Sequence, residues 1–162
     1  MDASRELLEA LRENARTDTD DLARQLGMSE EAVEDGIAAL EDDGVVRGYQ
    51  AIVDWERIDE ERALAAVELN VTLDRETGYE EIAMRIARFP QVTDLRLVSG
   101  DFDFLMQVEA DSVREISRFV SEKVAPVPEV TQTVTHFVMD TYKERGIELR
   151  DGYDDDRLSV SP

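Results

Sequence analysis

The stretch between residues 95 and 108 constrains the fold most, because it has the pattern of a β-hairpin. Apolar side chains occupy every second position at Leu95 and Leu97 and again from Phe102 to Val108, and these runs flank the turn sequence Ser99-Gly100-Asp101. Period-two alternation on both sides of a Gly-Asp turn is typical of two antiparallel strands. We therefore expect a hairpin in the middle of a sheet.

The same alternation predicts the direction of the side chains in this hairpin. If Phe102, Phe104 and Met106 face the core, Asp103 points to the opposite face of the sheet. Backbone N–H groups at a glycine turn can hold a carboxylate, and Asp103 can accept from an ammonium group, so the hairpin suits a free amino acid. The alternative is a tight turn with solvated aspartates, and the hairpin alone leaves both interpretations open.

Composition excludes several classes of function. The 162 residues allow one domain or two small ones, and the absence of cysteine excludes disulfides and thiolate metal sites. The chain has no apolar run of about 18 residues and no basic-then-apolar leader at Met1. We expect a cytoplasmic protein that has no membrane partner, no cofactor and no metal site.

The charge of the chain is unusual. Against 39 acidic residues stand 18 basic ones, which gives a net charge of −21, and the acids are spread over every segment. Such self-repulsion opposes a compact state, but in molar salt the Debye length falls to about 3 Å and screens it. We therefore predict an origin in an extreme halophile; the alternative is an acidic protein of an ordinary cell that avoids nucleic acid.

Apolar side chains recur at helical spacing in three segments of the N-terminal part: 4–14, 18–26 and 29–43. Ser29 can cap the third helix, and a short helix followed by a glycine turn and a longer helix is typical of a helix-turn-helix. Residues 45–53 alternate as a strand would. The pattern predicts a winged helix-turn-helix.

The part from 63 to 140 reads strand, helix, strand, strand, helix, strand, so the fold class we expect is α+β, with a winged helix-turn-helix before a ferredoxin-like βαββαβ domain. Two helices on one face leave the other face bare, and we expect Leu105, Phe137 and Met139 there. An exposed apolar face of that size indicates a homodimer. The predicted segments are 1–53 for the winged unit, 54–62 for a linker, 63–143 for the ferredoxin-like domain and 144–162 for an acidic C-terminal tail.

Two sets of motifs resemble one family. The segment Val98-Ser-Gly-Asp-Phe-Asp-Phe-Leu105 resembles the effector loop of the Lrp/AsnC or feast/famine regulators, which are amino-acid-responsive transcription factors. The N-terminal half is similar to the same family through Arg16-Thr-Asp18 with Leu22-Ala23, Met28-Ser29, and Leu40-Glu-Asp-Asp-Gly-Val-Val-Arg-Gly-Tyr49. The resemblance covers roughly residues 4 to 143.

The resemblance implies a transcriptional regulator that binds double-stranded DNA and a small amino-acid-like effector at a subunit boundary. It also implies a homodimer, with a ring of four dimers as the larger assembly. Lys123 stands where well-studied relatives often have a threonine in the effector site. The effector-binding residues that follow from the motif match are Ser99, Gly100, Asp101, Phe102, Asp103, Thr133 and Thr135.

The third helix departs from the family, whose members commonly carry Arg or Lys there. Between Ser29 and Asp43 the chain has seven acids and no base, and such a helix repels phosphates. In molar salt this repulsion is screened, and hydrogen bonds can provide the contact. The DNA-binding residues expected on that account are Arg16, Arg24, Ser29, Arg47 and Gln50. The alternative is an effector sensor or assembly protein of the same fold that has lost DNA binding.

We expect no enzyme, although haem-pathway decarboxylases share both halves of this architecture. His136 is the single histidine, and strand parity places it on the core side with Val134, opposite Thr133 and Thr135. No pair of residues is therefore placed for nucleophilic or acid–base catalysis.

Overall fold

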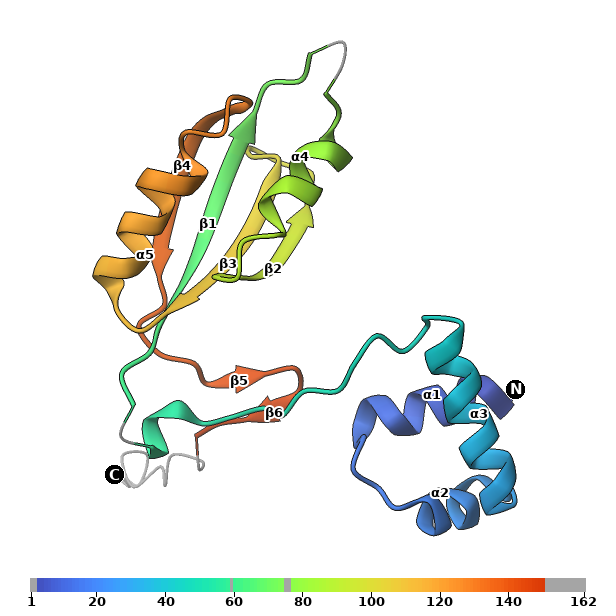
Figure 1. The fold of residues 1–162 in the computed structure, drawn as a ribbon. Helices are drawn as coiled ribbons and strands as arrows, with labels where there is room; N and C mark the ends of the chain where they lie inside the picture. Colours follow the sequence, from blue (N-terminus) through green and yellow to red (C-terminus); the bar gives the residue numbers. More distant parts are fainter. Residues whose placement is uncertain (1–2, 59, 75–76, 151–162) are drawn as a thin grey trace, which may run out of the picture. The chain divides into compact units, whose positions relative to one another are not determined.

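The structure is a computed structural model that describes residues 3–58, 60–74 and 77–150 of the chain. The chain divides into two compact units, Met1–Ala51 and Ile52–Pro162, which we call unit 1 and unit 2 (Figure 1). Among the described helices, none combines the length and the apolar character that a membrane span requires.

Unit 1 is built from the three predicted helices, α1 (Ala3–Glu13), α2 (Thr19–Leu26) and α3 (Glu30–Asp42). The Ser29 hydroxyl accepts a hydrogen bond from the Ala32 N–H at 3.2 Å, so it caps α3 as predicted. The helices pack around a small apolar core, which confirms the helix-turn-helix. The buried side chains of this core are Leu7, Leu11, Leu22, Ala23 and Val33.

A glycine inside α3 lies close to a buried side chain of α1. A Cβ atom at Gly36 would lie 2.8 Å from Cδ2 of Leu7, which is completely buried on α1. Glycine in a helix interior costs about 1 kcal/mol relative to alanine. Here that cost accompanies a contact that no larger residue can make without moving Leu7.

The strand predicted over 45–53 is absent from the structure. Residues 45 and 46 form a bend, residues 47–54 have no regular secondary structure, and no described strand pairs with this segment. A strand needs a partner for its backbone N–H and C=O groups, and an isolated segment with strand alternation lacks one. The Tyr49 hydroxyl instead donates to Oε1 of Glu41 at 2.9 Å, which joins the segment to the end of α3.

Unit 2 has the predicted βαββαβ order. Its elements are β1 (Ala63–Val71), α4 (Tyr79–Ile86), β2 (Val92–Leu97), β3 (Phe104–Ala110), α5 (Val113–Phe119) with the π-helical turn η2 (Val120–Val124), and β4 (Val130–Phe137). The sheet order is β2-β3-β1-β4, and every neighbouring pair is antiparallel. Both helices pack on one face of the sheet (Figure 1), so the ferredoxin-like prediction is confirmed.

A β-bulge reverses the predicted faces of β4. Val71 pairs with Val130 but Asn70 pairs with Gln132, so one extra residue is inserted in β4 at this point. Beyond the bulge, Thr133 and Thr135 lie opposite the buried Leu69 and Val67, on the helix-covered face. A one-residue insertion moves every later side chain to the other face, and the parity counted from Val130 was therefore wrong.

The face that carries no helix, which we call the bare face, consequently differs from the prediction. Leu105 lies on it as expected, because it pairs across β1 with Glu68, whereas Phe137 packs against the core and was placed wrongly. His136 is also on the bare face, exposed, with Nε2 3.0 Å from Oε1 of Glu68. The bare face includes Leu64, Ala66, Glu68, Leu105 and Gln107 on the two inner strands and Val134 and His136 on the edge strand β4.

A second small sheet was not anticipated. Residues 143–148, at the junction of the predicted domain and the acidic tail, form a hairpin of β5 (Lys143–Glu144) and β6 (Ile147–Glu148). Its turn has positive φ at Arg145 (47°) and Gly146 (92°), the combination that a tight two-residue hairpin turn requires. Of the predicted tail, 144–162, the part from 151 to 162 lies outside the described residues.

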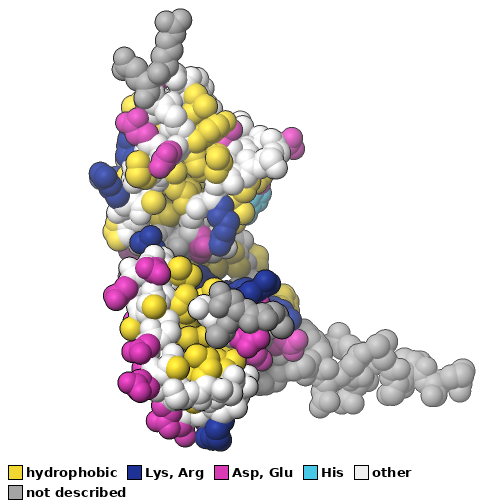
Figure 2. Space-filling view, turned by 90° about the vertical axis from the view of Figure 1, so that its right-hand side faces the viewer, with side chains coloured by type: hydrophobic (Ala, Val, Ile, Leu, Met, Phe, Trp, Pro, Cys, Tyr) yellow, Lys and Arg dark blue, Asp and Glu magenta, His cyan; other side chains and the backbone are white. Residues whose placement is uncertain are grey.

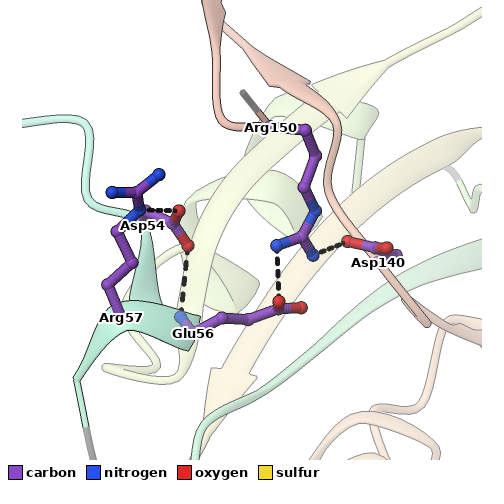
Figure 3. A network of polar contacts seen from close by, with 5 residues as sticks. All are labelled: Asp54, Glu56, Arg57, Asp140 and Arg150. Carbon is purple, nitrogen blue, oxygen red and sulfur yellow. Dashed lines mark hydrogen bonds and ion pairs between the residues drawn. The ribbon is translucent and has the colours of Figure 1, made fainter. Parts of the chain in front are cut away.

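Arg150 connects this hairpin to the start of unit 2. Its guanidinium donates to Oε2 of Glu56, in the 3₁₀ turn η1 (Trp55–Arg57), and to Oδ1 of Asp140 (Figure 3). Asp54 caps η1, because its Oδ1 accepts from the Glu56 N–H at 3.2 Å. The Asp140 pKa is lowered because Arg150 donates to the carboxylate. Arg150 thus joins the first turn of unit 2, η1, to the segment that follows β4.

Candidate DNA-binding and effector sites

The five residues predicted to bind DNA all lie on the surface of unit 1, but they differ in their partners. Arg24 on α2 is ion-paired with two acids of its own helix, Asp20 at 3.1 Å and Asp21. The pKa of Arg24 is raised because Asp20 accepts its hydrogen bond and Asp21 lies close by. These two carboxylates offset the positive charge with which Arg24 would bind a DNA phosphate.

Two other predicted arginines are available to bind a DNA phosphate. Within the described residues, neither Arg16 nor Arg47 has a carboxylate within 4.0 Å, and both are exposed. Nε of Arg47 donates to the Gly44 carbonyl at 2.8 Å, which holds the side chain beside the end of α3. The Ser29 hydroxyl accepts from Ala32 and can still donate, and Gln50 is exposed. No hydrogen bond or ion pair joins any two of the five predicted residues in the described part of the chain.

The acidic character of α3 is a surface property. Glu30 and Glu31 lie in its first turn, where the helix dipole favours negative charge, and its last turn contains no base. All seven acids between Ser29 and Asp43 are exposed. Helix α3 therefore presents carboxylates to solvent, and any DNA contact through it relies on screening of those charges.

The effector loop, which we define as Ser99–Asp103, is held in place through Asp103. Oδ2 of Asp103 accepts from the Val71 N–H at 2.9 Å and Oδ1 accepts from the Tyr79 hydroxyl at 2.9 Å. The predicted direction of this side chain was wrong: strand alternation does not extend to Asp103 because β3 begins at Phe104, and the carboxylate turns toward α4.

Tyr79, the first residue of α4, is a site residue that the sequence reasoning did not identify as one. Its hydroxyl reaches Asp103, while its ring packs edge-on against Phe104 with 5.8 Å between centroids. The pKa of Tyr79 is raised, because Asp103 accepts its hydrogen bond and because the phenol is desolvated.

The backbone of the effector loop leaves donors available. The Val98 N–H donates to the Asp103 carbonyl, and the Asp103 N–H donates to Leu69, each at 2.9 Å. Between them, the N–H groups from Ser99 to Phe102 donate to no other described residue. Gly100 has a φ of 142°, in the region that favours glycine. Such a loop can present several backbone donors to an anion.

A cavity of about 250 Å³ adjoins the effector loop and opens at the surface between α4 and β2. We call it the α4–β2 cavity. Hydrophobic side chains also gather on this side of unit 2 in the upper part of Figure 2. The cavity is lined by Tyr79, Glu80, Ala83, Leu95, Leu97 and Phe104.

The two predicted pocket threonines are not brought to the effector loop. Thr133 on β4 lies opposite Leu69 of β1, and Phe104, the residue after Asp103, lies on the other side of Leu69. Strand β1 therefore separates the threonines from Asp103 within one chain. No hydrogen bond links Thr133 or Thr135 with the effector loop among the described residues.

A helix-turn-helix unit joined to a βαββαβ unit with a glycine loop is typical of DNA-binding regulators that carry a ligand-binding domain. Comparison with known proteins specifies the family. Residues 64–147 match the Lrp/AsnC ligand binding domain, and residues 2–47 match a winged helix-turn-helix DNA-binding domain.

Individual proteins agree with this assignment. The transcriptional regulator YugG of Bacillus subtilis is 37% identical over 97% of this chain and 95% of its own length. The leucine-responsive regulatory protein of Haemophilus influenzae is 28% identical over 85% of this chain and 82% of its own length. A transcriptional regulator of Neisseria meningitidis, solved with L-methionine, superposes with a TM-score of 0.70 at 22% identity, over 89% of this chain and 92% of its own, which shows the shared fold. This chain belongs to the Lrp/AsnC family of DNA-binding transcriptional regulators.

Proposed function

We propose that this regulator binds an amino acid at the effector loop of unit 2 and that the bound amino acid alters the DNA affinity of unit 1. The observation that carries the proposal is the effector loop itself, where the half-buried Asp103 carboxylate lies beside unused backbone N–H donors. A carboxylate and a set of N–H groups match the ammonium and carboxylate of a free amino acid. The Haemophilus relative is named for leucine and the Neisseria structure contains L-methionine, which supports this class of effector.

In unit 1 we assign the DNA contacts to Arg16, Arg24, Ser29, Arg47 and Gln50. Arg16 and Arg47 are the main phosphate contacts in this assignment, because neither is paired with a carboxylate among the described residues. Arg24 contributes less, since Asp20 and Asp21 already share its guanidinium. Ser29 and Gln50 add hydrogen bonds that salt does not screen strongly.

We further infer that the bare face of the unit 2 sheet is the dimer interface and that dimers can assemble into a larger ring. The face carries the apolar side chains of Leu64, Leu105 and Val134, and Glu68 of β1, which contacts His136, lies between Leu105 and Val134. A two-fold axis would place the same patch of both copies together. Thr133 and Thr135 then belong to the effector site only if a neighbouring subunit completes it.

The acidic surface supports the inference that this protein works in molar salt, in the cytoplasm of an extreme halophile. A net charge of −21 on 162 residues repels itself and repels DNA unless the solvent screens it. The runner-up function, a sensor that has lost DNA binding, is favoured by one observation, the seven exposed acids of α3.

Fluorescence anisotropy distinguishes these two functions. The full-length protein is titrated onto the region upstream of its own coding sequence and onto a scrambled duplex, from about 0.5 M to about 3 M KCl. The regulator predicts specific binding that survives high salt, and Arg47→Ala should weaken it while Arg5→Ala, whose guanidinium is paired with Glu9, should not. A folded protein that binds neither duplex at any salt concentration is a sensor instead.

A further inference from the structure

We propose that His136 makes the association of two bare faces depend on pH, because its charge decides whether the Glu68 carboxylate enters the interface with a positive partner. This inference rests on the proposed function, since it takes the bare face as the dimer interface. The new observation is the charge pattern of that face. The chain has 39 acidic and only 18 basic residues, yet each acidic side chain within the strands of the main sheet has a basic partner.

The strands contribute three carboxylates to the bare face, and two of them have an arginine partner. The strand register places Glu68 of β1, Asp94 of β2 and Glu109 of β3 on this face. Arg62 pairs with Glu109, and Arg96 pairs with Asp94. Arginine stays protonated in proteins, so these two pairs carry no net charge across the neutral pH range. Glu68 is therefore the carboxylate whose partner can lose its charge.

Glu68 lies between apolar neighbours. Across the strands it pairs with Leu105 of β3 and with Val134 of β4, and its side chain is 31% exposed in the single chain. Its Oε1 lies 3.0 Å from Nε2 of His136. A second copy packed on this face removes water from the Glu68 carboxylate, and a carboxylate that loses water without a positive partner is costly.

The surroundings of His136 offer it no other ion pair within the described residues. On β1 it lies opposite Ala66, and the next residue across the sheet is the uncharged Gln107 of β3. Strand β4 is at the edge of the sheet, so no strand lies on its other side. The other ion pairs formed by strand residues of this face are Arg62–Glu109 and Arg96–Asp94. The charge of His136 is therefore coupled chiefly to Glu68.

The direction of the pH dependence follows from this pairing. Histidine changes charge between about pH 5 and about pH 8. At the lower end the imidazolium of His136 neutralises Glu68, whereas at the upper end each copy brings an unpaired carboxylate into the interface. The dimer therefore binds more protons than two monomers do, and its dissociation constant rises with pH. Because a dimer presents two helix-turn-helix units to DNA, the DNA affinity should fall over the same range.

Sedimentation velocity of the full-length protein tests the proposal. The Kd of the dimer is measured over a dilution series in about 2 M KCl, at about pH 5.5, about pH 7 and about pH 8.5. The chain contains one histidine and no cysteine, so His136 and the terminal amino group are the groups that ordinarily titrate in this range. We expect the Kd of the wild type to rise at least about tenfold from the lowest to the highest pH.

Two variants should differ from each other at high pH. His136→Asn keeps a polar side chain without charge, so its Kd should stay at the weak value that the wild type has at high pH. Glu68→Gln removes the carboxylate, so its dimer should remain tight at high pH, where the wild type is weak. Arg62→Gln is the matched control, because it breaks a pair that does not titrate in this range. It should weaken the dimer by the same factor at each pH.

The outcomes separate the two levels of inference. A wild-type Kd that stays constant or falls as the pH rises overturns the role of His136 and leaves the interface in place. A pH dependence that survives in His136→Asn does the same, because another group would then cause it. If the folded wild type is monomeric at every pH, or if Arg62→Gln dimerises as tightly as the wild type, the bare face is not the dimer interface and both inferences are wrong.

Discussion

Single residues set the local geometry in both units. In unit 1, Gly36 lets α1 and α3 approach closely, since a Cβ there would meet Leu7. In unit 2, Asp103 joins the end of β1 to the start of α4 through Val71 and Tyr79. The sequence analysis identified Asp103 only as a ligand, and helix propensity alone counts Gly36 only as a cost. Their contacts come from segments distant in the chain, which local patterns do not reveal.

Gly36→Ala should destabilise unit 1, although alanine is the better helix former. The propensity gain of about 1 kcal/mol is outweighed by overpacking, which costs about 1–3 kcal/mol when a buried group must move. Urea unfolding should show a loss of about 1 kcal/mol, and Leu7→Val should relieve part of it in the double variant. A Gly36→Ala protein more stable than wild type would show that Leu7 moves freely.

Tyr79 should titrate at higher pH than an ordinary tyrosine. The hydrogen bond to Asp103 and desolvation favour the neutral phenol in the folded state, so its pKa lies above 10.0. The stabilisation is complete below the unfolded pKa and is lost as the pH rises through the folded one. The ¹³C NMR shift of the Tyr79 ring should follow this titration, and Asp103→Asn should lower the pKa. Titration at or below pH 10 would contradict the contact.

At the scale of elements, prediction succeeded where periodicity is long and failed where one residue changes it. The three helices of unit 1 and the βαββαβ order follow from sustained apolar spacing. The faces of β4 could not be predicted, because the bulge opposite Asn70 and Val71 has no local signature. The strand over 45–53 also failed, because pairing depends on a partner that the segment itself does not contain.

The Arg150 contacts should hold the β5–β6 hairpin against η1 (Figure 3). Arg150→Ala removes both ion pairs, so amide hydrogen exchange in residues 54–57 and 143–149 should become several-fold faster. Lys143→Ala is the control, since its pair with Glu148 is longer, at 3.9 Å, and exposed. Because the Asp140 pKa is lowered, the protection should persist above the ordinary carboxyl pKa and disappear as the pH falls through the lowered value. Equal exchange in Arg150→Ala and wild type would assign the contacts no structural role.

At the scale of the whole molecule, the bare face and the net charge determine how copies associate. Val134 lies on the bare face, on the edge strand β4, and is 37% exposed. Val134→Asp puts an unpaired carboxylate from each copy into the proposed interface, so light scattering should report a monomer. Val113→Asp adds the same charge on α5, outside that face, and should leave the dimer intact. A dimeric Val134→Asp protein would place the interface elsewhere.

The central claim is that an amino acid bound to unit 2 changes the DNA affinity of unit 1, and thermodynamic linkage makes it directly measurable. The anisotropy titration of the upstream duplex is repeated in high salt with and without saturating L-leucine. We predict that leucine changes the dissociation constant for DNA by about 5- to 150-fold, and that DNA changes the leucine affinity by the same factor. Leucine that binds to the protein but leaves DNA affinity unchanged would contradict the claim.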